Sequence, residues 1–118
     1  AINTVGPGMV IDLKTKKPVL ANKAGGMSGP AVKPIMIRCV YDIYEATKGK
    51  VPILAVGGVQ TGDDAAEAIM AGAGAVGIGT GINYRGLEIF KTVSNELDTF
   101  MKSEKFKTIN DMRGVAHG

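Results

Sequence analysis

The sequence is poor in the residues that many catalytic and metal sites use. Its 118 residues include one cysteine, one histidine and no tryptophan, and aromatic residues make up 5% of the chain. A lone cysteine, Cys39, excludes a disulfide within the chain and a cysteine-rich metal site. It lies inside an expected helix, so we interpret it as a core residue. His117 has no partner at metal-ligand spacing and is interpreted as part of the tail. The sequence therefore predicts no metal site and no catalytic residue.

Charge and long apolar runs are also limited. Lysine and arginine number 14 against 11 aspartate and glutamate, which gives a net charge of +3. The small excess, the absence of a long basic run and the few aromatics argue against nucleic-acid binding. No apolar run reaches the length of about 18 residues that a membrane span needs, and no signal peptide is visible. A single cysteine is compatible with a reducing compartment, so we expect a cytoplasmic location.

Glycine, in contrast, is abundant, with 17 residues, and two glycine clusters stand out. Gly57-Gly58 closes the apolar run 51–56, and Gly79-Thr80 closes the run 75–78, 22 residues further on. Backbone N–H groups exposed at two neighbouring strand ends can cradle a phosphate, because no side chain blocks its approach. In a (β/α)₈ barrel such a site follows the last two strands. Ordinary tight turns remain the alternative interpretation.

The order of the expected elements predicts an α/β fold. Strands are expected at the end of 1–4, at 51–56 and at 75–79, and a β-hairpin insert with strands 9–13 and 18–21 follows the first strand. Helices are expected at 30–48, 63–71, 86–102 and 108–113, and Thr61 and Asp64 resemble a capping box. Strands that alternate with helices favour a parallel sheet. A whole barrel needs about 250 residues, so we expect the C-terminal part of a (β/α)₈ TIM barrel.

Two further places are candidates for binding. Ser28-Gly29 precedes a helix in a glycine-rich loop, where a flat ligand can approach the backbone closely, although Ser28 also suits a helix N-cap. Asn3 and Thr4 lie at the expected C-terminal end of the first strand, the end at which barrels bind ligands. For Asn3 and Thr4 the alternative interpretation is that their side chains cap the loop.

Six segments of the chain resemble the dihydroorotate dehydrogenase family. In chain order they are Ile2–Thr4, Ile11–Thr15, Lys17–Pro34, Val56–Val59, Val76–Thr80 and Met112–His117. The resemblance covers essentially all 118 residues but only the C-terminal portion of the family's chain. It implies that residues 1–118 are the C-terminal portion of a single FMN-binding barrel domain.

The resemblance also implies an activity and its ligands. Members of the family are flavin-dependent oxidoreductases that oxidise dihydroorotate to orotate in pyrimidine biosynthesis. The positions that match FMN-binding residues are Ile2, Gly29, Gly57, Gly58, Gly79 and Thr80, and those that match pyrimidine-binding residues are Asn3 and Thr4. The loop that ends at Gly29 looks most like the branch that works with a second subunit carrying FAD and an iron–sulfur cluster. The family's catalytic base belongs to the N-terminal half, so none is implied here.

Two other functions stay open at this stage. One is a non-catalytic half-barrel that binds a phosphorylated ligand, and the other is a different FMN barrel such as dihydropyrimidine dehydrogenase. In each case part of a barrel leaves open sheet edges and an exposed apolar inner face. We therefore expect the chain to associate, with the missing N-terminal half of the barrel or with another copy.

Overall fold

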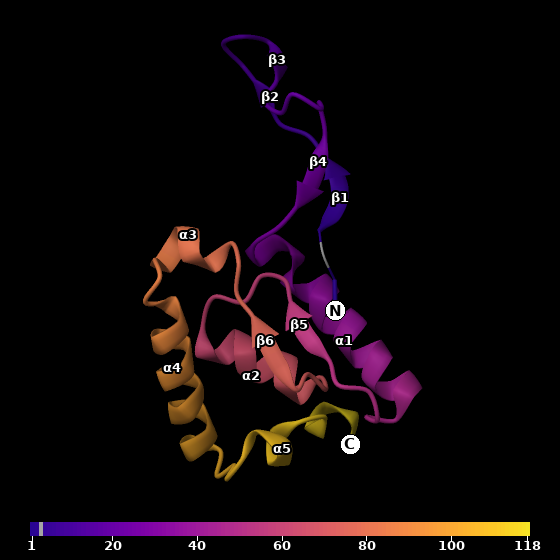
Figure 1. Ribbon diagram of the computed structural model, residues 1–118, viewed down its shortest axis with the longest axis vertical. Coiled ribbons are helices and arrows are strands. Elements are labelled where there is room, and N and C mark those ends of the chain that lie inside the picture. Colours follow the sequence, from indigo (N-terminus) through magenta and orange to yellow (C-terminus); the bar gives the residue numbers. More distant parts are fainter. Residues whose placement is uncertain (3) are drawn as a thin grey trace.

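Two parallel strands and the helix between them form the centre of the structure (Figure 1). The computed structural model describes residues 1–2 and 4–118. Strand β5 (Leu54–Val56) runs parallel to β6 (Ala75–Gly77), with Leu54 opposite Ala75 and Val56 opposite Gly77. Helix α2 (Gly62–Met70) connects them. The predicted parallel α/β arrangement is confirmed.

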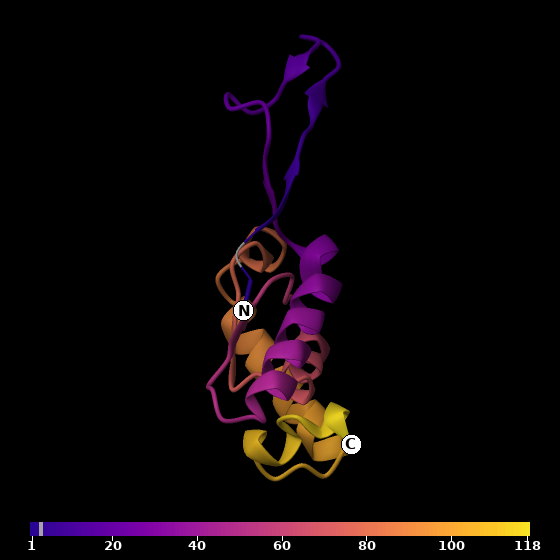
Figure 2. The ribbon, with the colours of Figure 1, turned by 90° about the vertical axis from the view of Figure 1, so that its right-hand side faces the viewer.

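The main helices gather on one side of these strands (Figure 2). Helix α1 (Lys33–Thr47) packs beside β5, and α4 (Ile89–Ser103) packs against α2. The core lies between strands and helices and includes the fully buried side chains of Met36, Val40, Ala55, Ala65 and Ile89. Alanine dominates the buried face of α2 because small side chains let the neighbouring helices approach closely.

The predicted capping box at the start of α2 is confirmed. The Thr61 hydroxyl accepts a hydrogen bond from the Asp64 backbone N–H at 3.2 Å, and the Asp64 carboxylate accepts one from the Thr61 N–H at 3.0 Å. This exchange satisfies two N–H groups that the first turn would otherwise leave unpaired. It fixes the point at which the chain leaves the first glycine turn and enters α2.

A long arm built from the N-terminal quarter projects away from the helices (Figures 1 and 2). At its root β1 (Val5–Gly8) pairs antiparallel with β4 (Gly25–Met27). Further out β2 (Ile11–Asp12) pairs with β3 (Lys17–Pro18). The predicted hairpin is thus present with shorter strands, and the Asp12 side chain closes its turn by accepting bonds from the N–H groups of Lys14 and Thr15 at 2.8 and 2.9 Å.

The remaining elements are short. They are the 3₁₀ turns η1 (Pro30–Val32) and η2 (Val115–His117) and the helices α3 (Gly81–Arg85) and α5 (Ile109–Met112). Among the residues that the structure describes, no helix has both the length and the apolar character needed to cross a bilayer.

Several predictions of local structure were wrong. Residues 1, 2 and 4 lie outside any strand, and the first strand is β1, which was not among the expected strands. Part of the glycine-rich loop that was expected to lead into Ser28-Gly29 is strand β4. The expected helix 86–102 begins at Ile89, and the separate helix α3 precedes it. Glycine-rich β1 and β4 carry no apolar alternation, so the sequence gives no local signal for a strand at either place. They form because their backbones pair with each other, and the sequence pattern does not reveal that contact between separate segments.

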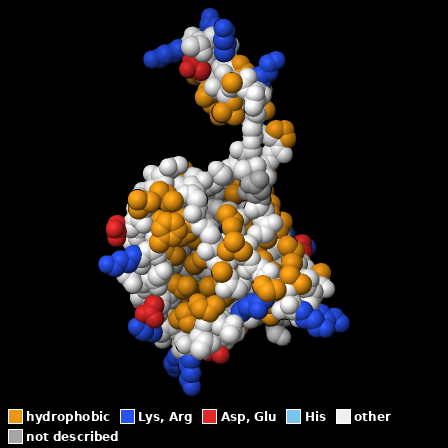
Figure 3. All heavy atoms as spheres, viewed as in Figure 1, with side chains coloured by type: hydrophobic (Ala, Val, Ile, Leu, Met, Phe, Trp, Pro, Cys, Tyr) orange, Lys and Arg blue, Asp and Glu red, His pale blue; other side chains and the backbone are white. Residues whose placement is uncertain are grey.

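The continuously apolar run 51–56 is typical of a parallel strand buried on both faces, but β5 is buried on one face only. Ile53 and Ala55 face the helices and are buried, whereas Leu54 is 56% exposed. Apolar side chains are visible on the side of the molecule opposite the helices (Figure 3). An open apolar strand face is what one sector of a closed barrel presents when the other strands are absent.

The sequence suggested that His117 belongs to a free tail, but in the structure its side chain is packed against the rest of the protein. Its ring stacks on Tyr41 with the centroids 3.9 Å apart and lies 4.6 Å from the ring of Tyr44. Its Nε2 lies 3.0 Å from the carbonyl oxygen of Ala71, which can only accept, so this nitrogen donates. The C-terminal segment is therefore packed against α1 and the end of α2.

Candidate functional site

A small hollow lies where β5 and β6 end. Its volume is about 170 Å³. Four separate segments line it, and their lining residues are Thr4, Ser28, Gly29, Val32, Val56, Gly57, Gly58, Gly79 and Thr80. Both glycine turns reach it because they follow parallel neighbouring strands, whose C-terminal ends share one edge of the sheet.

The first glycine turn requires glycine for the fold itself. Gly58 has φ of +76°, a backbone conformation that residues with a side chain rarely adopt. A Cβ added there would lie 2.7 Å from the carbonyl oxygen of Gly29 and 3.0 Å from the backbone nitrogen of Lys33. The turn after β5 is thus packed directly against the start of η1 and α1, which form one wall of the hollow.

The second turn differs, because nothing in the described residues demands glycine at position 79. A Cβ added to Gly79 would meet no atom within 4 Å, and its φ is not in the positive region. Gly79 nevertheless lines the hollow. A glycine that the fold does not need, at the rim of a hollow, keeps the backbone N–H accessible to a ligand.

A hydrogen bond between two hydroxyls joins the wall segments across the hollow. The Thr80 Oγ1 donates to the Ser28 Oγ at 2.9 Å, although the two residues are 52 positions apart. Neither hydroxyl caps a helix: the N-cap of η1 is Gly29, without a side-chain bond, and Thr80 makes no cap bond to α3. The N-cap interpretation of Ser28 is therefore wrong, and its hydroxyl faces the second glycine turn.

Most of the residues singled out in the sequence come together here. Gly29, Gly57, Gly58, Gly79 and Thr80 all line the hollow, and so does Thr4. The lining residues that the sequence did not select are Val32 and Val56. Ser28 was recognised only as half of a pair with Gly29, and its partner Thr80 is too distant in sequence for spacing to reveal the contact.

The N-terminal residues are placed less directly in the site. Ile2 does not line the hollow; its Cδ1 would lie 3.3 Å from a Cβ added at Gly57, so it packs behind the first turn. Asn3 lies outside the described residues. The Thr4 side chain lies against Gly26, where an added Cβ would be only 2.1 Å from the Thr4 hydroxyl. Gly26 thus lets Thr4 reach the root of the arm.

An ion-pair cluster behind the first turn ties α1 to α2. The Lys33 Nζ lies 2.7 Å from an oxygen of Asp64 and 2.8 Å from an oxygen of Glu67. Partial burial of Asp64 works against its ionisation, but hydrogen bonds from Lys33 and from the backbone of Gln60 and Thr61 outweigh it and lower its pKa. The same contacts, from Asp64 first and Glu67 second, raise the pKa of Lys33.

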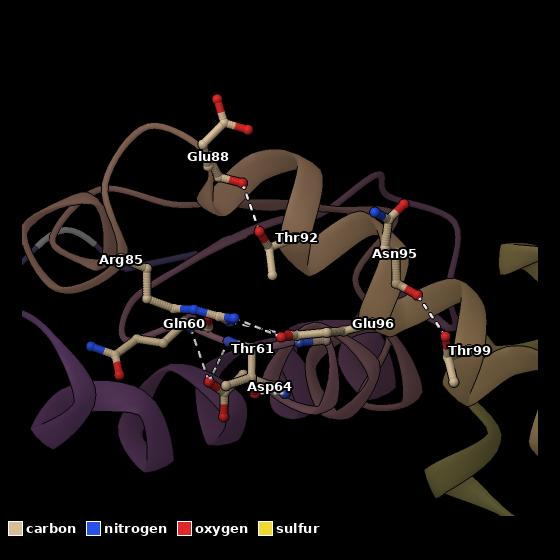
Figure 4. Close-up of polar contacts among 10 residues, drawn as sticks. Gln60, Thr61, Asp64, Arg85, Glu88, Thr92, Asn95, Glu96 and Thr99 are labelled. Atoms are coloured by element: carbon tan, nitrogen blue, oxygen red, sulfur yellow. Dashed lines mark hydrogen bonds and ion pairs between the residues drawn. The ribbon is translucent and has the colours of Figure 1, made fainter.

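A second cluster, formed by Arg85 and Glu96, connects the residues that follow the first glycine turn to helices α3 and α4 (Figure 4). Arg85 donates to the carbonyl oxygen of Gln60 at 2.8 Å and to the Glu96 carboxylate at 2.7 and 3.2 Å. Glu96 also accepts a bond from the Gly62 N–H at 2.7 Å. The hydrogen bonds from Arg85 and then Gly62 lower the pKa of Glu96, so both acids around this turn stay ionised.

The lining residues decide what chemistry the hollow can perform. None of them carries a group that titrates near neutral pH; the hollow offers backbone N–H groups and the hydroxyls of Thr4, Ser28 and Thr80. Cys39 lies on α1 and does not line it. No group of three possible metal ligands occurs among residues 1–2 and 4–118. The arrangement suits the binding of an anion and provides no general base.

A larger hollow, of about 260 Å³, lies on the arm. Its walls are Gly8, Met9, Val10, Val19, Leu20, Gly25, Gly26 and Met27. All of these are glycine or apolar, so this hollow lacks the polar side chains that would orient a small ligand.

Comparison with known proteins agrees with the geometry. The family model described as dihydroorotate dehydrogenase matches residues 1–101. The chain is 50% identical over 116 residues to a protein of Methanothermobacter thermautotrophicus named dihydroorotate dehydrogenase B (NAD(+)), catalytic subunit. It is 53% identical over 117 residues to the protein of the same name from Methanocaldococcus jannaschii. These alignments cover 98% and 99% of this chain but only 38% and 37% of the two relatives.

A solved structure extends the comparison to the fold. The crystal structure of DHODH from Eimeria tenella in complex with ferulenol superposes with a TM-score of 0.81 and 33% sequence identity. The superposition covers 98% of this chain and 30% of that one. The chain therefore spans little more than a third of the length of the relatives that it matches, and its fold is a sector of a (β/α)₈ barrel.

Proposed function

Because the chain belongs to the dihydroorotate dehydrogenase family, we propose that it supplies part of an enzyme that oxidises dihydroorotate to orotate in pyrimidine biosynthesis. Its share is the FMN phosphate site and part of the pyrimidine site. Residues 1–118 would form the C-terminal portion of a single barrel domain. The missing N-terminal half would supply the remaining strands and the catalytic base.

The observation that carries the proposal is the convergence of both glycine turns on one hollow whose lining carries hydroxyls and no charged side chain. Gly57-Gly58 and Gly79-Thr80 come from different strands yet line the same space, together with Gly29. Backbone N–H groups and hydroxyls, with no carboxylate among the lining residues, match the donors that a phosphate needs. Gly79, which the packing leaves free to carry a side chain, adds support for close approach of a ligand.

The residues present fit the phosphate end of FMN. Gly57, Gly58, Gly79 and Thr80 would hold the phosphate through their backbone N–H groups, and Gly29 would let the rest of the cofactor pass close to the backbone. Ile2, which packs behind Gly57, would support the flavin side of the site. When bound, the flavin accepts the hydride from the substrate. This chain's own contribution is to fix the position of the cofactor and to keep side chains out of its path.

Thr4 would provide part of the pyrimidine site, with Asn3 beside it in sequence. Thr4 lines the same hollow as the two turns, so a substrate held there would lie next to a cofactor anchored at Gly58 and Gly79. A hydroxyl offers both a donor and an acceptor, which suits the amide edge of a dihydropyrimidine.

A second subunit belongs to the proposal. Two relatives are named dihydroorotate dehydrogenase B (NAD(+)), catalytic subunit, and a name of this kind implies at least one further subunit. We propose that this chain's enzyme is cytoplasmic and has such a partner, carrying FAD and an iron–sulfur cluster. The open apolar face of β5 supports association with the rest of the barrel.

The test uses the full-length protein that contains this chain. Purified under mild conditions, it should show the visible spectrum of bound flavin, and dihydroorotate added without oxygen should bleach that spectrum. Dihydrouracil, as the matched control, should leave it unchanged. Bleaching by dihydrouracil and not by dihydroorotate would favour a dihydropyrimidine dehydrogenase. Binding of phosphate compounds without any flavin would favour a non-catalytic phosphate-binding half-barrel.

A further inference from the structure

The Ser28 and Thr80 hydroxyls have capacity that the fold does not use. A hydrogen bond between two hydroxyls consumes one of their two protons. Among residues 1–2 and 4–118, the only side-chain bond that either hydroxyl makes is the one between them, at 2.9 Å. Whichever hydroxyl donates in this bond, the proton of the other one has no acceptor in the described part of the chain. Both residues line the hollow at the strand ends.

The position of each hydroxyl is fixed by its backbone. Ser28 lies between β4, at the root of the arm, and Gly29, whose φ of +90° turns the chain into η1. Thr80 follows Gly79 at the end of the second turn, and its Cγ2 would lie 3.2 Å from a Cβ added at Gly29. The methyl group of Thr80 therefore packs toward Gly29, which directs its hydroxyl to Ser28.

We propose that Ser28 and Thr80 act as one unit in recognition of the ligand's phosphate. In the bound state Ser28 accepts from the Thr80 hydroxyl and donates its own proton to a phosphate oxygen, and Thr80 is the positioning residue that holds the Ser28 side chain in place. The unit selects a phosphorylated flavin over the same flavin without phosphate. This inference rests on the proposed function and adds a residue that the glycine pattern does not contain.

The experiment compares binding of FMN and of riboflavin, which lacks the phosphate, to the full-length apoprotein. In Ser28→Ala the Kd for FMN should rise about 10- to 100-fold, the range expected for a lost hydrogen bond to a charged group. The Kd for riboflavin should stay within about twofold of the wild-type value, because a substitution that removes no contact with the ligand usually changes the free energy by no more than about 0.5 kcal/mol. The ³¹P resonance of bound FMN should also shift. Ser94→Ala is the matched control, because Ser94 is exposed on α4 and bonds only to the Phe90 carbonyl oxygen.

Variants of Thr80 test whether the two hydroxyls work as a unit. Thr80→Val, which keeps the shape and removes the hydroxyl, should weaken FMN binding, whereas Thr80→Ser should restore it. The double variant Ser28→Ala/Thr80→Val should lose little more affinity than either single variant. Full additivity, or an equal loss of FMN and riboflavin affinity in Ser28→Ala, would overturn the inference. If the wild-type protein itself shows no preference for FMN over riboflavin, the phosphate site of the proposed function fails and the inference falls with it.

Discussion

Arg85 and Glu96 form a two-contact ion pair across the gap between α3 and α4, with nitrogen–oxygen distances of 2.7 and 3.2 Å (Figure 4). The pair also contacts the residues that follow the first glycine turn: Arg85 donates to the Gln60 carbonyl oxygen, and Glu96 accepts a hydrogen bond from the Gly62 N–H. The planar guanidinium group is suited to such simultaneous contacts. Residues that do not line the hollow thus help to fix where the chain leaves the first turn.

Replacing Arg85 should loosen that turn. We expect Arg85→Ala to lower the urea midpoint and Arg85→Lys to recover only part of the loss, since an ammonium group cannot make the paired contacts. Arg38→Ala is the control: Arg38 also bonds to an acid, Asp42, but its side chain is 77% exposed, and exposed pairs contribute little. Equal midpoints for Arg85→Ala and Arg38→Ala would show that the pair at the turn has no special role.

Gly62 allows α2 to lie close to α4. A Cβ at Gly62 would be 2.4 Å from the Glu96 Cβ. Alanine normally stabilises a helix relative to glycine by roughly 0.5–1 kcal/mol, but here the clash reverses the sign. We expect Gly62→Ala to destabilise the protein by about 1–3 kcal/mol, the usual cost of overpacking. Chemical denaturation of Gly62→Ala and the wild-type protein measures this, and a more stable variant would contradict the packing.

The Lys33–Asp64 pair gives stability a defined dependence on pH. The pKa of Asp64 is lowered in the folded protein, so its contribution is present above its unfolded pKa of about 4 and is lost as the pH falls through the folded value. The pKa of Lys33 is raised, so its contribution is present below about pH 10.4 and is lost as the pH rises through the folded value. Asp64→Asn should therefore flatten the acid limb of the curve of unfolding free energy against pH. An unchanged acid limb in Asp64→Asn would refute this assignment.

The chemistry of the site was more predictable than its geometry. Glycine after an apolar run is a local signal, and the Gly57-Gly58 and Gly79-Thr80 turns were placed correctly at the ends of β5 and β6. The bond between Ser28 and Thr80 joins segments 52 residues apart. No periodicity encodes it, because it depends on how β4 enters the body of the protein.

The same distinction explains the errors in the fold. The helices α1 and α2 carry apolar faces, α2 also begins at a capping box, and both were found from the sequence. Strands β1 and β4 consist largely of glycine, and their pairing supplies backbone bonds without a side-chain pattern. The exposed Leu54 looks like a core residue in the sequence because its apolar character suits a closed barrel, of which this chain forms one sector.

His117 should stabilise the C-terminal segment. Its ring stacks on Tyr41, and its Nε2 donates to the Ala71 carbonyl oxygen. Because His117→Ala removes an aromatic contact and one hydrogen bond, we expect it to lower the free energy of unfolding by about 1–2 kcal/mol. Lys107→Ala, at an exposed position, should stay within about 0.5 kcal/mol of the wild-type value. Thermal and urea unfolding of both variants provide the measurement, and equal stabilities would mean that the stacked ring contributes nothing.

Gly79→Ala separates binding from folding, because the two roles of glycine diverge at this residue. An added methyl group would touch nothing within 4 Å, so the unfolding free energy should change by less than about 0.5 kcal/mol. The same methyl group would stand at the rim of the hollow and hinder the approach of a phosphate to the backbone, so FMN affinity should fall by tenfold or more. Gly74→Ala, at the other end of β6 and with its nearest neighbour 3.9 Å from the added Cβ, should change neither quantity. If Gly79→Ala binds FMN as tightly as Gly74→Ala while both are folded, the phosphate does not approach this turn. The open space at Gly79 would then have another cause.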